Sequence, residues 1–219
     1  MHPAAHPDPD PLSEALHRHG LVAILRARSH GPLLETIRVL VDAGVRIVEV
    51  TVPTPGSMEA VAAAATEFGS EVLVGTGTVV TAEDVSRTAD AGGRFVVSPH
   101  NDPAVITAAR ASGLGSLPGA YTPTEVLAAW RCAPSAVKIF PASALGPHYV
   151  ASLAAPLPDI PVVPTGGIGV DDIAAYRSAG AVAVGVSSPL IGDALSGGSL
   201  SELHRRARRY VLASGGHTS

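Results

Sequence analysis

Lys138 is the only lysine in a chain whose other fourteen basic residues are all arginine. It stands inside the apolar run Ala136–Phe140, which is typical of a buried strand, and burying an unpaired ammonium is costly. Burial also lowers the pKa of an amine and makes it nucleophilic toward carbonyl carbons, a role that an always-protonated guanidinium cannot take. We therefore predict that Lys138 forms a Schiff base. The alternative is a structural lysine that pairs with a carboxylate or reaches solvent at the end of its strand.

Glu49 has a similar position in the second half of the apolar run Arg46–Thr51. Because side chains alternate along a strand, Ile47, Glu49 and Thr51 share one face, just as Ala136, Lys138 and Phe140 do in theirs. Schiff-base chemistry needs a group that moves protons, and a partly buried glutamate near a lysine suits that role. We predict that Glu49 is the general acid and base. A structural ion pair between Glu49 and Lys138 is the alternative.

Glycines and an arginine follow other predicted strands and could hold an anion. Gly166 and Gly167 follow the seventh predicted strand, where glycines let backbone N–H groups approach a phosphate, although they equally serve a tight turn. Ser188, after the eighth, can donate a hydroxyl to the same phosphate. Arg26 closes the first strand and can clamp a carboxylate or a phosphate.

Two other kinds of site are not predicted. The chain has no G-x-S-x-G nucleophile motif. The histidines show no metal-ligand spacing such as H-E-x-x-H, so no metal or other cofactor is expected; those considered are His17, His19, His30, His100, His148, His204 and His217.

Short apolar runs alternate with longer amphipathic stretches along the chain, which is the pattern of βα units in a parallel sheet. The predicted strands are Leu21–Leu25, Arg46–Thr51, Glu71–Gly75, Phe95–Ser98, Gly115–Leu117, Ala136–Phe140, Val162–Thr165 and Val182–Val186. Three similar tripeptides, which end at Gly44, Gly92 and Gly180, each precede a predicted strand, as a glycine that ends a helix would. These repeats indicate successive αβ units.

Eight such strands in 219 residues predict an α/β fold, a (β/α)8 TIM barrel with an N-terminal helix. An open, doubly wound sheet is the alternative, but no G-x-G-x-x-G follows the first strand. We expect one domain over residues 12–213, flanked by a mobile tail at residues 1–11 and a second tail at residues 214–219. In a barrel of this kind the active site lies at the carboxyl ends of the strands.

The composition excludes several classes of partner. A net charge of −4 offers no footprint for nucleic acid, and the arginines at positions 205, 206, 208 and 209 are expected to form the polar face of a helix. Four prolines interrupt the charge-free window from Ile139 to Pro158, so no membrane partner is expected. A single cysteine, Cys132, and an N-terminus without a signal-peptide pattern favour the cytoplasm.

Four of these motifs together resemble the 2-keto-3-deoxy-6-phosphogluconate (KDPG) and 4-hydroxy-2-oxoglutarate (KHG) aldolase family. They are EVTVPTP around Glu49, GTGTV around Thr78, VKIFPAS around Lys138, and PTGGI with Gly166 and Gly167. The similarity extends from about Leu21 to Tyr210, and the motifs fall in the family's order and spacing. The resemblance implies a class I aldolase on a (β/α)8 barrel, a homotrimer, that releases pyruvate.

The resemblance also implies roles for single residues. Lys138 matches the family's Schiff-base lysine, and Glu49 matches its general acid and base. Thr78 and Arg26 match residues that contact the pyruvate-derived end of the substrate or line the pocket, and Phe140 matches the aromatic wall beside the lysine. The phosphate site is matched by Gly166, Gly167 and Ser188. All of these residues are present in this chain.

One departure bears on the substrate. Pro53 stands four residues after Glu49, where gluconate-type members often carry an arginine that helps to hold the substrate carboxylate. The stretch from Phe140 to Tyr149 also resembles the galactonate-type branch. We expect cleavage of a 2-keto-3-deoxy-6-phospho-sugar acid, gluconate type favoured, to pyruvate and glyceraldehyde 3-phosphate. The alternatives are the galactonate epimer, 4-hydroxy-2-oxoglutarate, an isomerase on the same barrel, or a non-catalytic phosphate-binding module.

Overall fold

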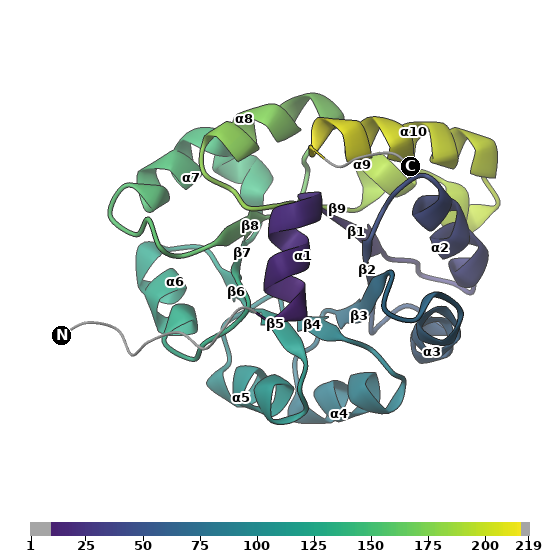
Figure 1. Cartoon of the computed structure of the whole chain (residues 1–219), viewed down its shortest axis with the longest axis horizontal. Helices are drawn as coiled ribbons and strands as arrows, with labels where there is room; N and C mark the ends of the chain where they lie inside the picture. The colour runs from purple at the N-terminus through teal and green to yellow at the C-terminus, as the bar shows by residue number, and fades with distance from the viewer. Residues whose placement is uncertain (1–9, 216–219) are drawn as a thin grey trace.

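The computed structural model describes residues 10–215 as an α/β fold in which parallel strands curl around a common interior, with helices outside them (Figure 1). The strands are β1 (Leu21–Leu25), β2 (Ile47–Thr51), β3 (Leu73–Gly77), β4 (Phe95–Val97), β5 (Gly115–Leu117), β6 (Gly119–Ala120), β7 (Val137–Ile139), β8 (Val162–Pro164) and β9 (Val184–Val186). We call the face of these strands that is turned toward the common interior the inner face.

The helices alternate with the strands, as the amphipathic stretches predict. They are α1 (Pro11–His19), α2 (Leu33–Asp42), α3 (Ser57–Phe68), α4 (Ala82–Asp90), α5 (Pro103–Ala111), α6 (Pro123–Trp130), α7 (Gly146–Ala154), α8 (Ile173–Ser178), α9 (Ser188–Ile191) and α10 (Leu200–Ala213). Gly44, Gly92 and Gly180 have positive φ values of 102°, 75° and 102°. Each follows the end of α2, α4 or α8, as the repeated tripeptides predict.

Hydrogen bonds group the strands into two sheets, a six-stranded one in the order β5-β4-β3-β2-β1-β9 and a three-stranded one in the order β6-β7-β8. Every pairing is parallel. An isolated bridge between Thr165 and Gly185 and a 3.1 Å hydrogen bond from Val182 N to Val162 O join β8 to β9. The carboxyl ends of all the strands therefore lie at one end of the fold.

Six of the predicted strands differ from the observed ones by one or two residues at one or both ends, and one short strand was not predicted. The fifth predicted strand, Gly115–Leu117, is observed as β5, and a short strand that was not predicted, β6, follows it. Pro118 separates the two, since proline has no N–H to donate to a ladder, although Pro118 O still accepts a 2.9 Å hydrogen bond from Lys138 N. The third runs over Leu73–Gly77 and not Glu71–Gly75. Its glycines have low strand propensity, but pairing with β2 extends the strand to Gly77.

Helix α1 lies across the end of the fold where the strands begin (Figure 1). Leu12 and Leu16 are buried there in one cluster with inner-face residues of the strands, among them Ile47, Phe95 and Leu117. Asp10 is the N-cap, accepting a 2.8 Å hydrogen bond from Ser13 N, so the helix begins at Pro11, one residue before the predicted domain boundary at residue 12. The rest of the predicted tail, residues 1–9, lies outside the described residues, as do residues 216–219 of the C-terminal one.

The arginine-rich helix α10 buries Leu203, Ala207, Tyr210 and Val211 and turns most of its arginines to solvent, as predicted. Arg206 departs from that expectation, because it is half-buried and donates hydrogen bonds to Leu190 O (3.0 Å) and Ile191 O (2.9 Å). It thereby holds the end of α9. Within residues 10–215, none of the helices is both long and apolar enough to cross a membrane.

Candidate active site

Lys138 lies on the inner face of β7, and only 6% of its surface is exposed. Its backbone neighbours Val137 and Ile139 belong to the hydrophobic layer beneath the helices, so alternation along the strand turns the lysine inward. Burial lowers the pKa of its ammonium, an effect that Glu49 opposes and Arg26 reinforces. A lysine in this state carries more of the neutral amine near neutral pH than an exposed one.

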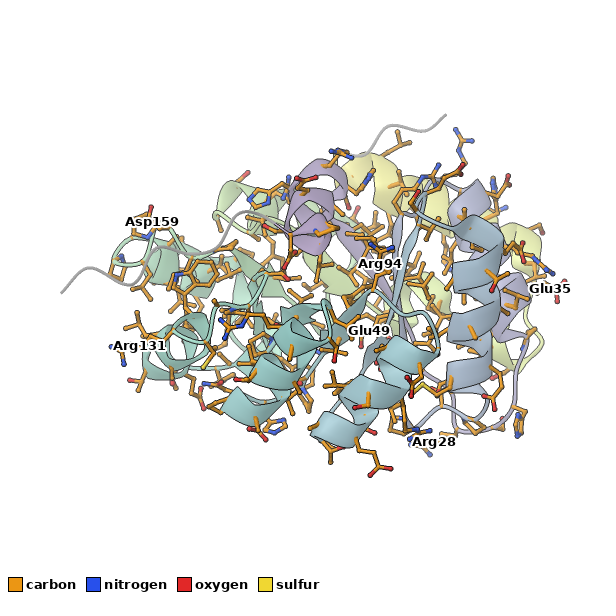
Figure 2. The ribbon with its side chains drawn as sticks, turned by 60° about the horizontal axis from the view of Figure 1, so that its bottom comes forward. Arg28, Glu35, Glu49, Arg94, Arg131 and Asp159 are labelled. Atoms are coloured by element: carbon orange, nitrogen blue, oxygen red, sulfur yellow. The ribbon has the colours of Figure 1, made fainter. Side chains whose placement is uncertain are left out.

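Glu49 lies on the inner face of β2 and is 2% exposed. Burial raises the pKa of its carboxyl group. The charges of Lys138 and, to a smaller extent, Arg26 lower this pKa and so oppose the effect of burial. Figure 2 shows Glu49 in the interior, between Arg94 on the side of α1 and Arg28 at the opposite end of the fold. Glu49 and Lys138 both lie buried on the inner face, as the alternation along each strand predicts, and each affects the pKa of the other.

The two groups are not held together as a tight ion pair. Within residues 10–215, no Glu49 oxygen lies within the 4.0 Å that defines an ion pair with the Lys138 ammonium. Burial disfavours both charges, raising the pKa of the acid and lowering that of the amine. The arrangement suits a proton donor and a neutral nucleophile that face a common space, more than a salt bridge that holds the fold.

Arg26 and Thr78 meet at the carboxyl ends of β1 and β3. Arg26 Nη2 donates a 3.1 Å hydrogen bond to Thr78 Oγ1, and the guanidinium is near enough to affect both Glu49 and Lys138 electrostatically. Thr78 has a φ of 58°, which is strained for a β-branched residue. A fixed hydroxyl and a fixed cation therefore stand beside the amine and the acid.

Phe140 and the glycine turn form the far side of the site. The Phe140 ring centroid lies 4.9 Å from Lys138 Nζ, and a Cβ added at Gly166 would lie 3.3 Å from Phe140 Cε2. Gly166 and Gly167 have φ values of 99° and 73°, so both positions favour glycine. A Cβ at Gly167 would also lie 2.6 Å from Ser143 Cβ. The turn thus packs closely against the segment that follows β7.

Ser188 begins α9, after β9, and its side chain is exposed. No hydrogen bond joins Ser188 to Gly166 or Gly167 within the described part of the chain, but the bridge between Thr165 and Gly185 makes their strands neighbours. In the same part of the chain, the amide N–H groups of Gly167 and Ile168 donate to no protein acceptor. These N–H groups and the Ser188 hydroxyl are available to an anion.

Thr165 is a polar residue that the sequence analysis did not select. It is buried between β8 and β9, its Oγ1 donates a 3.2 Å hydrogen bond to Val163 O, and a Cβ at Gly185 would overlap its side chain. Its position directly before Gly166, at the end of an apolar strand, is the same signal that selected Glu49 and Lys138. Applied to every strand end, that signal would have included Thr165.

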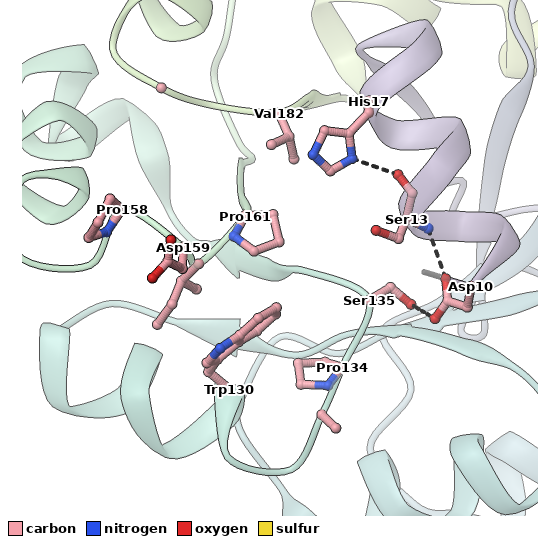
Figure 3. Close-up of a pocket in the computed structure, with 13 residues that line it drawn as sticks. Asp10, Ser13, His17, Trp130, Pro134, Ser135, Pro158, Asp159, Pro161 and Val182 are labelled. Carbon is pink, nitrogen blue, oxygen red and sulfur yellow. Dashed lines mark hydrogen bonds between the residues drawn. The ribbon is translucent and has the colours of Figure 1, made fainter. Parts of the chain in front are cut away.

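A hollow with a volume of about 320 Å³ lies beside α1, at the end of the fold opposite the carboxyl ends of the strands (Figure 3). Trp130, Pro134, Pro158 and Pro161 form its walls, and Asp10 lies at its edge, where it accepts a 2.6 Å hydrogen bond from Ser135 Oγ. Neither Lys138 nor Glu49 lines this hollow. The residues proposed for catalysis therefore lie outside this hollow.

Over residues 10–215 no three His, Cys, Asp or Glu side chains gather closely enough to hold a metal ion. The groups of the site are an amine, a carboxylic acid, a hydroxyl, a guanidinium and an aromatic ring.

Comparisons with known proteins identify the family to which the chain is similar. The family model described as KDPG and KHG aldolase matches residues 12–204. The probable 2-dehydro-3-deoxy-6-phosphogalactonate aldolase of Rhizobium meliloti (strain 1021) is 35% identical over 183 residues, which are 83% of this chain and 86% of that relative. The 2-dehydro-3-deoxy-phosphogluconate aldolase of Treponema pallidum (strain Nichols) is 36% identical over 166 residues, 75% of this chain and 79% of that relative.

A solved structure described as "Native KDPGal structure" has a TM-score of 0.83 at 33% sequence identity and covers 88% of this chain and 93% of its own. The curled parallel sheet with its outer helices is therefore shared with that protein. The family match covers more than half of the chain, and the relatives are similar over most of their length. The chain therefore belongs to the KDPG and KHG aldolase family and is a carbon–carbon lyase.

Proposed function

We propose that this enzyme is a class I aldolase that reversibly cleaves a 2-keto-3-deoxy-6-phospho-sugar acid to pyruvate and glyceraldehyde 3-phosphate. The observation that carries the proposal is the sole lysine, buried on the inner face with a lowered pKa and facing a buried glutamic acid. Near neutral pH such an amine attacks carbonyl carbons. Among residues 10–215, neither group contributes to an ion pair that would explain its burial as structural.

In the cleavage direction, the neutral Lys138 amine attacks the C2 carbonyl carbon, and Glu49 relays the protons that turn the carbinolamine into a protonated imine and water. The imine withdraws the electron pair of the C3–C4 bond as the C4 hydroxyl loses its proton to the Glu49 carboxylate. Glyceraldehyde 3-phosphate leaves, Glu49 returns the proton to C3 of the enamine, and water releases pyruvate. No redox partner is needed, and the water lost at the first step is regained at the last.

The remaining residues bind substrate in this proposal. Arg26 and Thr78, joined by their hydrogen bond, hold the carboxylate end beside the amine. Phe140 forms the wall over the imine nitrogen. The amides of the Gly166–Gly167 turn and the Ser188 hydroxyl hold the phosphate. The N–H groups of Gly167 and Ile168 support this role, since they donate to no acceptor among the described residues.

Borohydride trapping tests the proposal. Pyruvate plus borohydride is expected to attach one reduced pyruvate per chain, located at Lys138 by peptide mass spectrometry. Lys138→Arg keeps the charge but is expected to give no adduct and no turnover. Full turnover by the arginine variant, or an adduct that forms equally without Lys138, would contradict the Schiff base.

The epimer at C4 is a separate question. The family resemblance favours the gluconate type, whereas the relative from R. meliloti and the solved KDPGal structure support the 6-phosphogalactonate epimer as a second candidate. KHG, which lacks the phosphate, is the third. Measuring kcat/KM on both epimers and on 4-hydroxy-2-oxoglutarate with one preparation decides among them. A 6-phospho-sugar acid is expected to give the highest value, and a higher value for 4-hydroxy-2-oxoglutarate would contradict the proposed substrate class.

Architecture and assembly complete the proposal. We take residues 12–213 as one domain in which the two sheets form a single closed (β/α)8 barrel, supported by the bridge between Thr165 and Gly185 and by the continuity of β5 and β6 across Pro118. We also take the enzyme to be a cytoplasmic homotrimer, supported by the family resemblance and by the single cysteine of these 219 residues. A solution mass of about three times 22.1 kDa by light scattering would support the trimer, and a monomer mass would contradict it.

A further inference from the structure

Strand β3 contributes no side-chain atoms to the inner face over its last three residues. Gly75 and Gly77 are the inward-facing positions there, because Thr76 between them points outward and its Oγ1 lies 2.5 Å from Thr88 Oγ1 of α4. Two neighbouring side chains fill the space. A Cβ at Gly75 would lie 2.7 Å from the Phe95 ring, and a Cβ at Gly77 would lie 2.6 Å from Glu49 Cγ and nearer still to Cδ and Oε1.

The backbone does not require glycine at position 77. Its φ is not positive, unlike those of Gly166 and Gly167, and the residue sits in regular register opposite Thr51, with Gly77 O accepting a 2.8 Å hydrogen bond from Val52 N. Alanine fits such a strand conformation. Glycine is therefore needed at position 77 for space, and the atoms that use this space belong to the Glu49 carboxyl group.

Within the described part of the chain, no hydrogen bond or ion pair fixes the direction of that carboxyl group. No described N–H or O–H group donates a hydrogen bond to it, and no cation forms an ion pair with it. A buried carboxyl without such partners takes its position from the shape of its surroundings. The gap at Gly77 is the part of those surroundings that the carboxyl group occupies.

We propose that Gly77 is a positioning residue for Glu49: the missing side chain creates the space that sets the carboxyl group at the distance from Lys138 needed for proton transfer. The inference rests on the function proposed above for Glu49. A methyl group at position 77 pushes the carboxyl group out of that space, because the added Cβ would overlap the Glu49 side chain.

A stability cycle tests the steric part. Thermal unfolding is measured for the wild type, Gly77→Ala, Glu49→Ala and the double variant. Gly77→Ala is expected to lower Tm by about 5 °C while Glu49 is present, since overpacking a filled interior is destabilising, and by far less in the Glu49→Ala background. If Gly77→Ala alone fails to fold, the double variant is expected to fold. Equal losses in both backgrounds, or a double variant that also fails to fold, overturn the proposal.

A proton-transfer assay tests the functional part. NMR follows the exchange of the pyruvate methyl protons for deuterium, which needs enamine protonation but no phosphorylated substrate. Gly77→Ala is expected to slow this exchange by about 10²-fold and to alter its pH profile, while the borohydride adduct at Lys138 still forms. Exchange at the wild-type rate with the wild-type pH profile overturns the proposal.

Gly115→Ala is the matched control. Gly115 also faces inward, but at the α1 end, where an added Cβ would lie 2.7 Å from Leu12 Cβ. The Gly115→Ala variant is expected to lower Tm and to leave the pH profile of proton exchange unchanged. A shifted pH profile in this variant would show that any loss of stability shifts the profile, and this result overturns the inference. If the wild type neither forms the adduct nor exchanges protons, the proposed function itself is contradicted. The stability coupling between positions 77 and 49 does not depend on that function, because it is measured by thermal unfolding.

Discussion

The Phe140 ring centroid lies 4.9 Å from Lys138 Nζ, so an aromatic face covers the amine in an otherwise apolar strand. The ring attracts the charged amine and the protonated imine electrostatically, by about 0.5–2 kcal/mol in comparable sites. Phe140→Leu is therefore expected to slow cleavage roughly 3- to 10-fold and to lower the pKa of Lys138 further. Adduct formation measured against pH should then reach half its maximum at a lower pH, with Phe140→Tyr as the control that keeps the ring. An unchanged midpoint would show that the ring does not act on the charge.

Replacing Glu49 with glutamine removes proton transfer but keeps the shape. Glu49→Gln is expected to lower kcat roughly 10²- to 10⁴-fold, the usual contribution of a general acid or base, while Lys138 still forms some adduct with pyruvate on long incubation. Stopped-flow or NMR rates check the loss. Wild-type kcat would remove Glu49 from the mechanism.

The same variant makes a prediction about stability. Because the folded-state pKa of Glu49 is raised above its ordinary value of 4.5, ionisation of this group favours unfolding, and stability falls as pH rises through the window above 4.5. Glu49→Gln removes that term, so its Tm relative to the wild type should increase between about pH 5 and pH 8. Calorimetry across that range measures it. A constant difference in Tm would show that the carboxyl group ionises equally in both states.

Arg26 lowers the pKa of both Lys138 and Glu49, so its removal should raise both. Arg26→Gln is expected to move both limbs of the pH profile of kcat/KM to higher pH and to increase the KM for pyruvate in the synthetic direction. Arg28→Gln, an exposed neighbour two residues on, is the matched control. If both limbs of the pH profile of kcat/KM stay at the wild-type pH, Arg26 does not act on the ionisation of Lys138 and Glu49.

Ser188 is expected to act only on a phosphorylated substrate. Ser188→Ala should raise the KM for a 6-phospho-sugar acid by about 10-fold or more, the effect of one hydrogen bond to a charged group, and leave the KM for 4-hydroxy-2-oxoglutarate unchanged. Ser187→Ala, next to it in the chain, serves as the control. Equal effects on both substrates would place the phosphate elsewhere.

Asp10 joins α1 to the strands at the end of the fold remote from the site. It accepts hydrogen bonds from Ser13 N (2.8 Å) and Ser135 Oγ (2.6 Å), and Ser135 Oγ in turn accepts one from Ser116 N (3.0 Å). Asp10→Ala should cost about 1–2 kcal/mol of unfolding free energy through the lost N-cap and leave kcat unchanged. Asp10→Asn, which keeps one acceptor, should lose less. Urea unfolding provides the measurement, and a fall in kcat for folded Asp10→Ala would contradict the separation of the two ends.

Local patterns in the sequence located most of the elements. The β1 strand is observed as predicted, and the helix ends at Gly44, Gly92 and Gly180 follow from the glycine each one requires. The predictions of strand bounds and side-chain exposure were wrong where a tertiary contact outweighs the local preference of the residues. Strand β3 extends past its predicted end at Gly75 because β2 pairs with Thr76 and Gly77. Arg206 is half-buried because it binds the carbonyl groups at the end of α9.

The sequence by itself determined which residues are unusual: a lone lysine and a glutamate in apolar strands, where burying a charge is too costly without a use. Only the tertiary structure decided how they meet. It placed Phe140 over the Lys138 amine and the Glu49 carboxyl group in the space left by Gly77. The physical reason is that alternation along a strand defines which face a side chain takes, whereas its neighbours across the interior depend on the curl and register of strands far apart in the chain.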